Sequence, residues 1–326
     1  MARTSLTRAA GVLVSAMLLG APPVAAADAY PSRPVKIVVG FAAGGGSDTA
    51  TRLFAAKLSE HWGRQIVVEN RGGAGGILAA ELVAHAAPDG YTLFNCGISH
   101  VLRALLYKKL PFDARRDFAP ISPIATFANV LVVPPDSPFR SLSDLLAYAR
   151  AHPGKLHYGS SGVGGSMHLT MELFKAQAGI DIVHVPYKGG SPAFADLLAH
   201  QLDANFDNST VMAGPVRAGQ VRALAVSTAA RWPTLPDVPG AAEAGVPGFD
   251  VLAFYGLCAP AATPVPVLDK LNADTLAVLR NPDVAARFAE QSIAPAPMTR
   301  GQFAAFLAEQ FAIWQRALKQ AGIEPE

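Results

Sequence analysis

The sequence is poor in charge, and its basic residues are scattered. Only 16% of its 326 residues are charged, the formal net charge is +2, and the longest basic runs are pairs such as Lys108-Lys109. A nucleic-acid-binding protein needs basic residues clustered in a patch or stripe. We therefore expect no nucleic-acid partner, and a small molecule is the more plausible one.

Cysteine is also scarce, and neither cysteine belongs to a metal-binding pattern. Cys96 and Cys258 both lie in apolar segments that are typical of strands. An oxidising compartment would allow a disulfide, but one pair far apart in the sequence does not establish it. We expect two buried thiols, and pairing stays open. The patterns His-Glu-x-x-His and Cys-x-x-Cys are absent, so we expect no metal site and no cofactor.

Long apolar runs are missing after the first residues of the chain. Residues 1–27 carry Arg3 and Arg8, then an apolar stretch from Ala9 to Ala21, then small residues ending at Ala27. This order is typical of a cleavable secretory signal peptide, with an uncleaved anchor as the alternative. No later run reaches the roughly 18 to 20 residues of a membrane span, so we expect a soluble, exported protein.

The rest of the chain is long enough for two domains and has an α/β pattern. Removing 27 of 326 residues leaves 299, above the roughly 250 residues at which single cores usually stop growing. Apolar, β-branched runs lead repeatedly into glycine-rich turns and then into amphipathic helices, which predicts parallel strands with helical connections. Two domains of this kind would leave a cleft between them.

The pattern predicts individual elements as follows. Strands are expected at 35–39, 66–68, 91–94, 129–133, 157–159, 182–186, 204–206, 223–227 and 251–258. Helices are expected at 48–62, up to about 86, and at 167–177, 192–200, 267–279, 283–291 and 301–319. Segment 111–123 is interpreted as a connecting loop. Crossings near 129–133 and 251–258 would form a hinge between lobe 1 (28–127 plus 250–326) and lobe 2 (128–249).

The turn at 40–47 has the spacing of a phosphate-binding loop, but Gly46 occupies the lysine position. Without the lysine, nucleotide triphosphate binding loses its main cation. The glycines still let the backbone approach a ligand, and the helix start that Ser47 or Asp48 is expected to cap offers free N–H groups to an anion. A carboxylate suits this turn, although on its own it could be an ordinary turn without a ligand.

A second turn, Ser160 to Ser166, has the same placement in what is predicted to be the other lobe. The two turns could face each other across the cleft and hold a small carboxylate through backbone N–H groups and serine hydroxyls. The candidate ligand contacts are Phe41, Ala43, Gly44, Gly45, Ser47, Asp48, Ser99, Ser160, Gly162, Gly165, Ser166, His168, Tyr187, Lys188 and Asp207.

Several of these candidates have an equally simple structural interpretation. Lys188 is either the one cation near the ligand or a solvated surface lysine, and Tyr187 either forms a pocket wall or ends a strand. Asp48 is expected to act at the helix start, whereas Asp207 fits a pocket and a turn equally well. His168, in a first helical turn, would be neutral and either donate a hydrogen bond or pack.

Short segments spread over the mature sequence form a characteristic set. They are Tyr30 to Val39, the turn ending Gly-Gly-Gly-Ser-Asp48, Glu69-Asn70-Arg71 with Gly73 to Gly76, Asp89 to Leu93, Ser99-His100, Asp117 to Ile121, Ser160 to His168, Val185 to Gly189, Phe206 to Asn208 and Pro236 to Pro239. In these segments the sequence resembles the Bug family, the substrate-binding components of tripartite tricarboxylate transporters. The family usually has proline where this chain has Ala43, so its first turn is expected to be less rigid.

The resemblance implies a periplasmic protein with a type II Venus flytrap fold, two lobes and crossing hinge strands. It implies a monomer that binds a di- or tricarboxylate, an acidic amino acid or an aromatic acid through turns 41–48 and 160–168, partly through waters. Its partner would be the membrane subunits of a transporter, or a sensor if the protein signals. A hydrolase is the main rival, but Gly159-Ser160-Ser161-Gly162 misplaces the second glycine of the G-x-S-x-G elbow. Gly46, at the position where a phosphate-binding loop has lysine, weakens the alternative of a nucleotide-binding protein.

Overall fold

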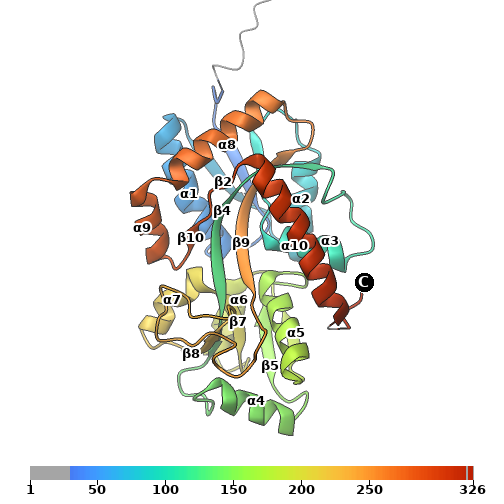
Figure 1. The fold of residues 1–326 in the computed structure, drawn as a ribbon, viewed down its shortest axis with the longest axis vertical. Helices are drawn as coiled ribbons and strands as arrows, with labels where there is room; N and C mark the ends of the chain where they lie inside the picture. Colours follow the sequence, from blue (N-terminus) through green and yellow to red (C-terminus); the bar gives the residue numbers. More distant parts are fainter. Residues whose placement is uncertain (1–29, 321, 326) are drawn as a thin grey trace, which may run out of the picture.

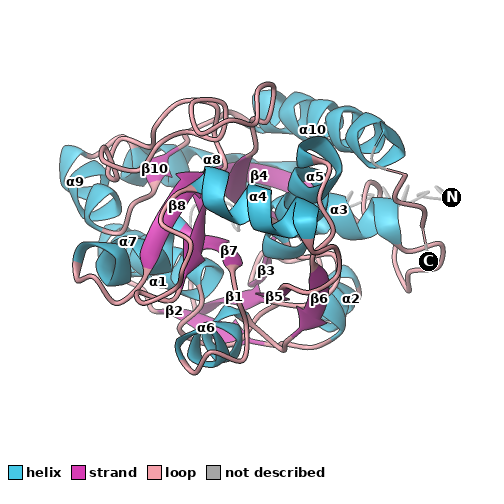
Figure 2. Ribbon diagram, turned by 90° about the horizontal axis from the view of Figure 1, so that it is seen from below, coloured by secondary structure: helices cyan, strands magenta, loops and turns pink. Residues whose placement is uncertain are grey.

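The computed structural model describes residues 30–320 and 322–325, which form two lobes joined by long strands (Figure 1). The predicted signal peptide lies outside these residues. Helices lie on the outside of the strands in both lobes (Figure 2). The α/β prediction is therefore confirmed.

The first lobe is built on parallel strands with an antiparallel neighbour. Strand β1 (Val35–Val39) lies between β2 (Ile66–Asn70) and β3 (Thr92–Asn95), parallel to both, and β3 pairs with the antiparallel β9 (Leu252–Pro260). The short β10 (Ala294–Pro295) pairs with the long strand β4 (Phe118–Val133). The helices of this lobe are α1 (Gly46–Trp62), α2 (Ile77–Ala84), α3 (Ile98–Leu106), α8 (Val265–Leu279), α9 (Pro282–Glu290) and α10 (Arg300–Gln320), with a 3-10 turn η1 (Ala74–Gly76) before α2.

The second lobe continues from the far half of strand β4 (Phe118–Val133). There β4 pairs with β7 (Asn205–Asn208) and β8 (Arg222–Val226), while β5 (His157–Ser160) pairs in parallel with β6 (Val183–Pro186). The helices are α4 (Leu142–Ala151), α5 (Ser166–Ala178), α6 (Gly190–Leu198) and α7 (Ser209–Arg217). Alternate β4 residues serve two cores, because Leu131 and Val133 face one side and Val130 and Val132 the other.

Strands β4 and β9 connect the lobes. They pair with each other from Phe118 to Ala128 on β4, and from Asn129 onward β4 pairs with strands of the second lobe. Strand β4 begins at Phe118, so interpreting 111–123 wholly as a loop was wrong. Prolines in that segment are tolerated because the β4–β9 register shifts at Pro120/Ser122 and Pro123/Ala125, where the ladder is irregular.

A disulfide joins Cys96 to Cys258, with 5.8 Å between their Cα atoms. The expectation of two buried thiols was wrong. Strand pairing explains the contact, because β3 and β9 are antiparallel neighbours with Phe94 opposite Cys258, and the Cys96 N–H donates to the Gly256 carbonyl. The bridge fixes the end of β3, just before α3, to the connecting strand β9.

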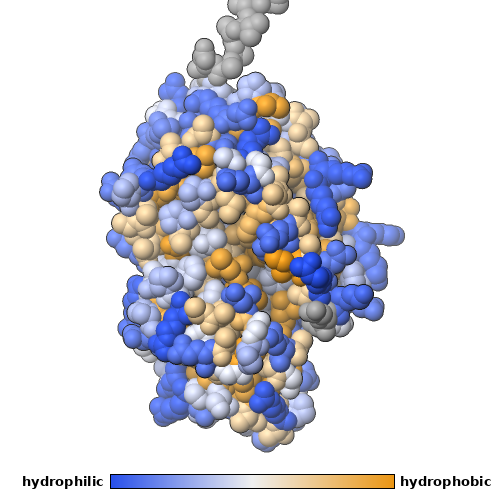
Figure 3. Space-filling model, in the orientation of Figure 1, coloured by the Kyte–Doolittle hydropathy of each residue, from blue (hydrophilic) through white to orange (hydrophobic). Residues whose placement is uncertain are grey.

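Apolar side chains gather near the middle of the face in Figure 3, and hydrophilic side chains are prominent along its two side edges. A groove runs between α5, α10 and residues 248–252, and the exposed apolar side chains of Leu252 and Ile313 line part of it. Within the described residues, no helix combines the length and apolar character needed to cross a membrane.

Candidate functional site

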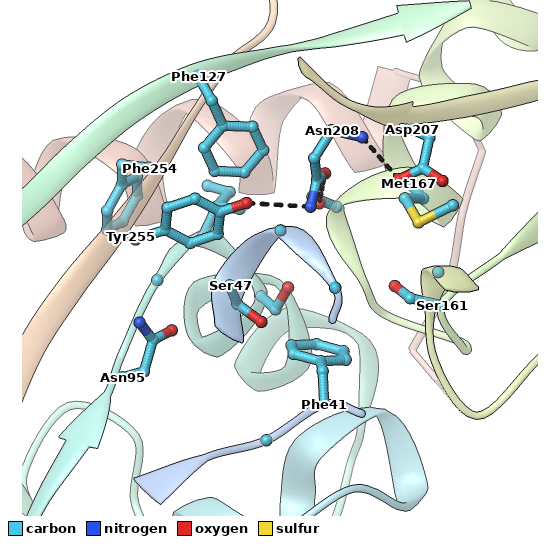
Figure 4. Close-up of a pocket in the computed structure, with 18 of the residues that line it drawn as sticks. Phe41, Ser47, Asn95, Phe127, Ser161, Met167, Asp207, Asn208, Phe254 and Tyr255 are labelled. Carbon is cyan, nitrogen blue, oxygen red and sulfur yellow. Dashed lines mark hydrogen bonds between the residues drawn. The ribbon is translucent and has the colours of Figure 1, made fainter. Parts of the chain in front are cut away.

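A buried pocket lies between the two lobes, beside the connecting strands (Figure 4). Its lining residues are Gly40, Phe41, Gly45, Gly46, Ser47, Phe94, Asn95, Gly97, Ile98, Ser99, Arg103, Phe127, Ser161, Ser166, Met167, Gly190, Asp207, Asn208, Phe254 and Tyr255. Figure 4 shows Phe41, Ser47 and Asn95 of the first lobe facing Ser161 and Met167 of the second. The cavity volume is only about 40 Å³, so the lobes are closed over it.

Five helices begin at this pocket. Their N-cap residues are Gly45 (α1), Gly97 (α3), Gly165 (α5), Gly189 (α6) and Asn208 (α7), and none of these makes a side-chain capping hydrogen bond. Helix starts leave N–H groups unpaired and carry a partial positive charge. Five such ends around one pocket form a site for an anion.

The first turn is held in shape by Asp48. Its carboxylate accepts hydrogen bonds from the Gly44 N–H (2.9 Å), Arg52 Nε (2.9 Å) and Asn70 Nδ2 (3.0 Å). Burial by itself raises the pKa of Asp48, but these hydrogen bonds outweigh it and hold the pKa below its usual value. The predicted cap was wrong, because α1 begins at Gly46 with Gly45 as its N-cap. Asp48 orders the turn instead of facing the pocket.

The second turn rests on two neighbouring histidines whose rings are tilted to each other. The Gly164 N–H donates to His168 Nδ1 (3.3 Å), and the His168 ring lies 4.2 Å from that of His184. Burial lowers the pKa of both histidines to about 4. His168 is therefore neutral at neutral pH, as predicted, and its Nδ1 accepts a backbone hydrogen bond that positions the turn.

Ser160 lies behind this turn and is not arranged as a nucleophile. Its hydroxyl is 2.6 Å from His184 Nε2, which resembles a catalytic pair. However, Ser160 is completely buried, and its hydroxyl also hydrogen-bonds to the backbone of Gly162. Among the described residues no carboxylate pairs with His184 to orient it, as a hydrolase triad requires.

Asp207 brings a carboxyl group into the pocket from the end of β7. One oxygen accepts the Asn208 N–H (2.7 Å), whereas Oδ2 has no hydrogen-bond partner. The residue is 2% exposed, and burial raises its pKa to about 7. A carboxyl group with this pKa is partly protonated at neutral pH, so it can donate a hydrogen bond to an anion.

The wall beside the connecting strands is aromatic. Tyr255 of β9 stacks on Phe127 of β4 with 4.2 Å between ring centres, and its hydroxyl accepts a hydrogen bond from Asn208 Nδ2 (3.0 Å; Figure 4). Asn208 thus connects the second lobe to a strand that runs between the lobes. None of these three residues was predicted, because their strand contexts carry no local signal for a ligand.

Arg103 also lines the pocket and was not predicted. It is 2% exposed on α3, a helix that was not predicted. Its Nη1 donates to the Gly75 carbonyl (2.5 Å), but its Nε has no partner. Burial lowers the pKa of Arg103 to about 10, so the side chain still carries its charge at neutral pH.

The predicted site residues divide into two groups. Phe41, Gly45, Ser47, Ser99, Ser166 and Asp207 line the pocket. Ala43, Gly44, Asp48, Ser160, Gly162, Gly165, His168, Tyr187 and Lys188 do not. Most of the second group build or support the two turns. Tyr187 points its hydroxyl at Asp196 (2.6 Å), and Lys188 is exposed, which agrees with the structural alternatives for both.

Comparison with known proteins relates the whole described chain to one group. Residues 50–323 match the sequence model described as tripartite tricarboxylate transporter family receptor. Protein BugT of Bordetella pertussis is 32% identical over 321 residues, which cover 98% of each chain.

Two solved structures are similar over nearly the whole chain. R. palustris Rpa4515 with adipate has a TM-score of 0.88 at 37% identity and covers 91% of this chain and 100% of its own. MatC of Rhodopseudomonas palustris with bound malate has a TM-score of 0.84 at 34% identity and covers 89% and 100%.

Proposed function

Because the chain belongs to the receptor family of tripartite tricarboxylate transporters, as the resemblance to Bug proteins predicted, we propose that its interlobe pocket captures a small organic carboxylate for delivery to the membrane subunits of such a transporter. The protein is a solute-binding protein of a periplasmic family and not an enzyme.

The proposed binding site rests on one observation, the convergence of five helix starts on the pocket. The N-terminal N–H groups of α1, α3, α5, α6 and α7 supply donors from both lobes. Hydrogen bonds to a charged group contribute about 1.5 to 3 kcal/mol each. Several of them, less the cost of ordering, account for a micromolar complex at about −8 kcal/mol.

The ligand we propose is a carboxylate of the kind that the similar proteins hold. Rpa4515 was solved with adipate and MatC with malate, and both are small aliphatic dicarboxylates. Phe41, Phe127 and Tyr255 give the pocket apolar walls suited to a short carbon chain, with polar groups at the helix starts. Acidic amino acids and aromatic acids are the competing classes.

Capture is proposed to occur by hinge closure. Residues 28–127 plus 250–326 form one lobe and residues 128–249 the other, with β4 and β9 as the hinge. A ligand that touches helix starts of both lobes binds the closed arrangement more tightly than the open one and shifts the population towards it. The protein acts as a monomer, exported to the periplasm by a signal peptide that is removed.

The test is a ligand screen on protein freed of bound solute by unfolding and refolding. Di- and tricarboxylates, acidic amino acids and aromatic acids are assayed by thermal shift and calorimetry, with the amide of each acid as its uncharged control. We expect one class to raise the melting temperature by mass action, and native mass spectrometry of untreated protein to detect that class. If no carboxylate gives a shift or heat, the proposal is wrong.

A further inference from the structure

Arg103 is a buried cation without a counter-ion in the described chain. Neither its Nε nor its other guanidinium nitrogens form an ion pair with any carboxylate of residues 30–320 and 322–325, and the one hydrogen bond is to the Gly75 carbonyl. Burying a charge is costly unless it is paired and hydrogen-bonded. The residue therefore lacks the partner that would make its burial favourable.

The position of Arg103 places it between the lobes and not merely within one. In the first lobe it contacts the η1 turn, where a Cβ atom on Gly76 would lie 2.9 Å from Nη1. In the second lobe, a Cβ atom on Gly164 would lie 3.4 Å from Arg103 Cγ. Both neighbours are glycines with positive φ, so no side chain separates Arg103 from either turn. The residue also lines the pocket.

We propose that Arg103 binds a second carboxylate of the ligand, so that the protein selects dianions over monoanions. This inference rests on the proposed function, which requires only one carboxylate at the helix starts. The guanidinium, with donors in a planar fork, matches carboxylate geometry.

The pocket carries more positive charge than a single carboxylate can neutralise. Each helix start contributes about half an elementary charge, and five of them with Arg103 far exceed the one negative charge of a monoanion. Asp207 offsets only part of this, because burial leaves it partly protonated at neutral pH. A dianion with one carboxylate at the helix starts and one at Arg103 matches the surplus better.

The experiment compares linear saturated dicarboxylates with the monomethyl ester of each. The ester keeps the chain and one carboxylate and removes the second charge. We expect wild-type protein to bind the best dicarboxylate about 10- to 100-fold more tightly than its ester, the factor that a hydrogen bond to a charged group contributes. Calorimetry gives both dissociation constants.

Three variants assign the preference to Arg103. Arg103→Gln is expected to bind dicarboxylate and ester with equal affinity, whereas Arg103→Lys keeps a smaller preference for the dicarboxylate because it keeps the charge. Arg64→Gln is the matched control, since Arg64 is exposed and its guanidinium donates a hydrogen bond to the neighbouring Gly63 carbonyl. Circular dichroism and melting temperature report whether each variant folds.

The inference and the proposed function fail in different ways. If wild-type protein binds ester and dicarboxylate equally, or if Arg103→Gln keeps the wild-type preference, Arg103 does not bind a second carboxylate and the proposed function stands. If wild-type protein binds neither these ligands nor any other carboxylate of the screen, the proposed function itself is wrong. The comparison of dicarboxylate with ester in wild-type protein tests the preference for dianions even if Arg103→Gln does not fold.

Discussion

Gly46 lies where the first lobe, the second lobe and the strand β9 meet. A Cβ atom at this position would lie 2.4 Å from Tyr255 Oη and 2.6 Å from Asn208 Nδ2, whereas ordinary contacts begin at 3.4 Å. Gly46→Ala is therefore about 1 Å short of space in the closed arrangement. Tyr255 cannot easily give way, because it is 4% exposed and stacked on Phe127.

The strain from Gly46→Ala falls partly on the proposed closure of the lobes. Opening would carry Asn208 away with the second lobe and relax its short contact, whereas the short contact with Tyr255, which lies in the first lobe, would remain. Overpacking of this kind costs about 1 to 3 kcal/mol. Because we propose that the ligand binds the closed state, we expect its affinity to fall by about 5- to 150-fold. The melting temperature of the ligand-free protein should fall as well, because the contact with Tyr255 persists in the open state.

Calorimetry with the strongest ligand of the screen measures this effect. Gly301→Ala is the matched control, because a Cβ atom on Gly301, in the first turn of α10, meets no heavy atom within 4 Å. The control should bind as wild type does. Wild-type affinity in Gly46→Ala would refute the reasoning, since the added methyl group would then not oppose closure.

Two further predictions concern pH and the disulfide. Asp207 has a pKa near 7 in the folded protein and 3.8 as its ordinary value, so the folded state retains a proton that the unfolded state releases. This stabilisation is complete below about pH 4 and is lost as pH rises through 7. Asp207→Asn should flatten the dependence of the free energy of unfolding on pH between about pH 4 and 7, measured by urea unfolding. In wild type, carboxylate affinity should fall above pH 7, where Asp207 loses its proton, and Asp207→Asn should remove this fall. Unchanged pH profiles of the variant would contradict both expectations. Replacing Cys96 and Cys258 together by alanine should lower the free energy of unfolding by about 2 to 5 kcal/mol, because the bridge joins positions 162 residues apart. Urea unfolding measures the loss, and equal stability of the variant and wild type would show that the bridge adds nothing.

Local patterns in the sequence were sufficient for the elements that repeat. The helix at 48–62 was predicted from apolar residues at helical spacing, and α1 buries Ala50, Phe54 and Leu58 as that spacing requires. The turns at 40–47 and 160–166 were predicted from glycines between a strand and a helix, and both lie next to the pocket. These signals depend only on neighbours in the chain.

The missed features depend on neighbours in space. Strand β4 begins in a proline-containing segment, which the sequence favours as a loop, because β9 and the register shifts stabilise it there. Helix α3 carries no N-terminal capping side chain, since Gly97 precedes it at the pocket, so its start gave no signal. Missing α3 also meant missing Arg103. The disulfide likewise depends on the pairing of β3 with β9, which no local pattern specifies.

Arg103 and Asp207 carry opposite charges in one pocket, yet neither appears among the causes of the other's pKa shift. Had they been in contact, each would have neutralised the other, and the pocket would have lost its preference for anions. Keeping them apart leaves Arg103 unpaired and Asp207 partly protonated, both at a cost to the ligand-free protein. The dicarboxylate that we propose would relieve both costs at once, because it would supply the missing counter-ion and accept a hydrogen bond from the protonated acid. The groups that destabilise the empty pocket would then add to the free energy of ligand binding.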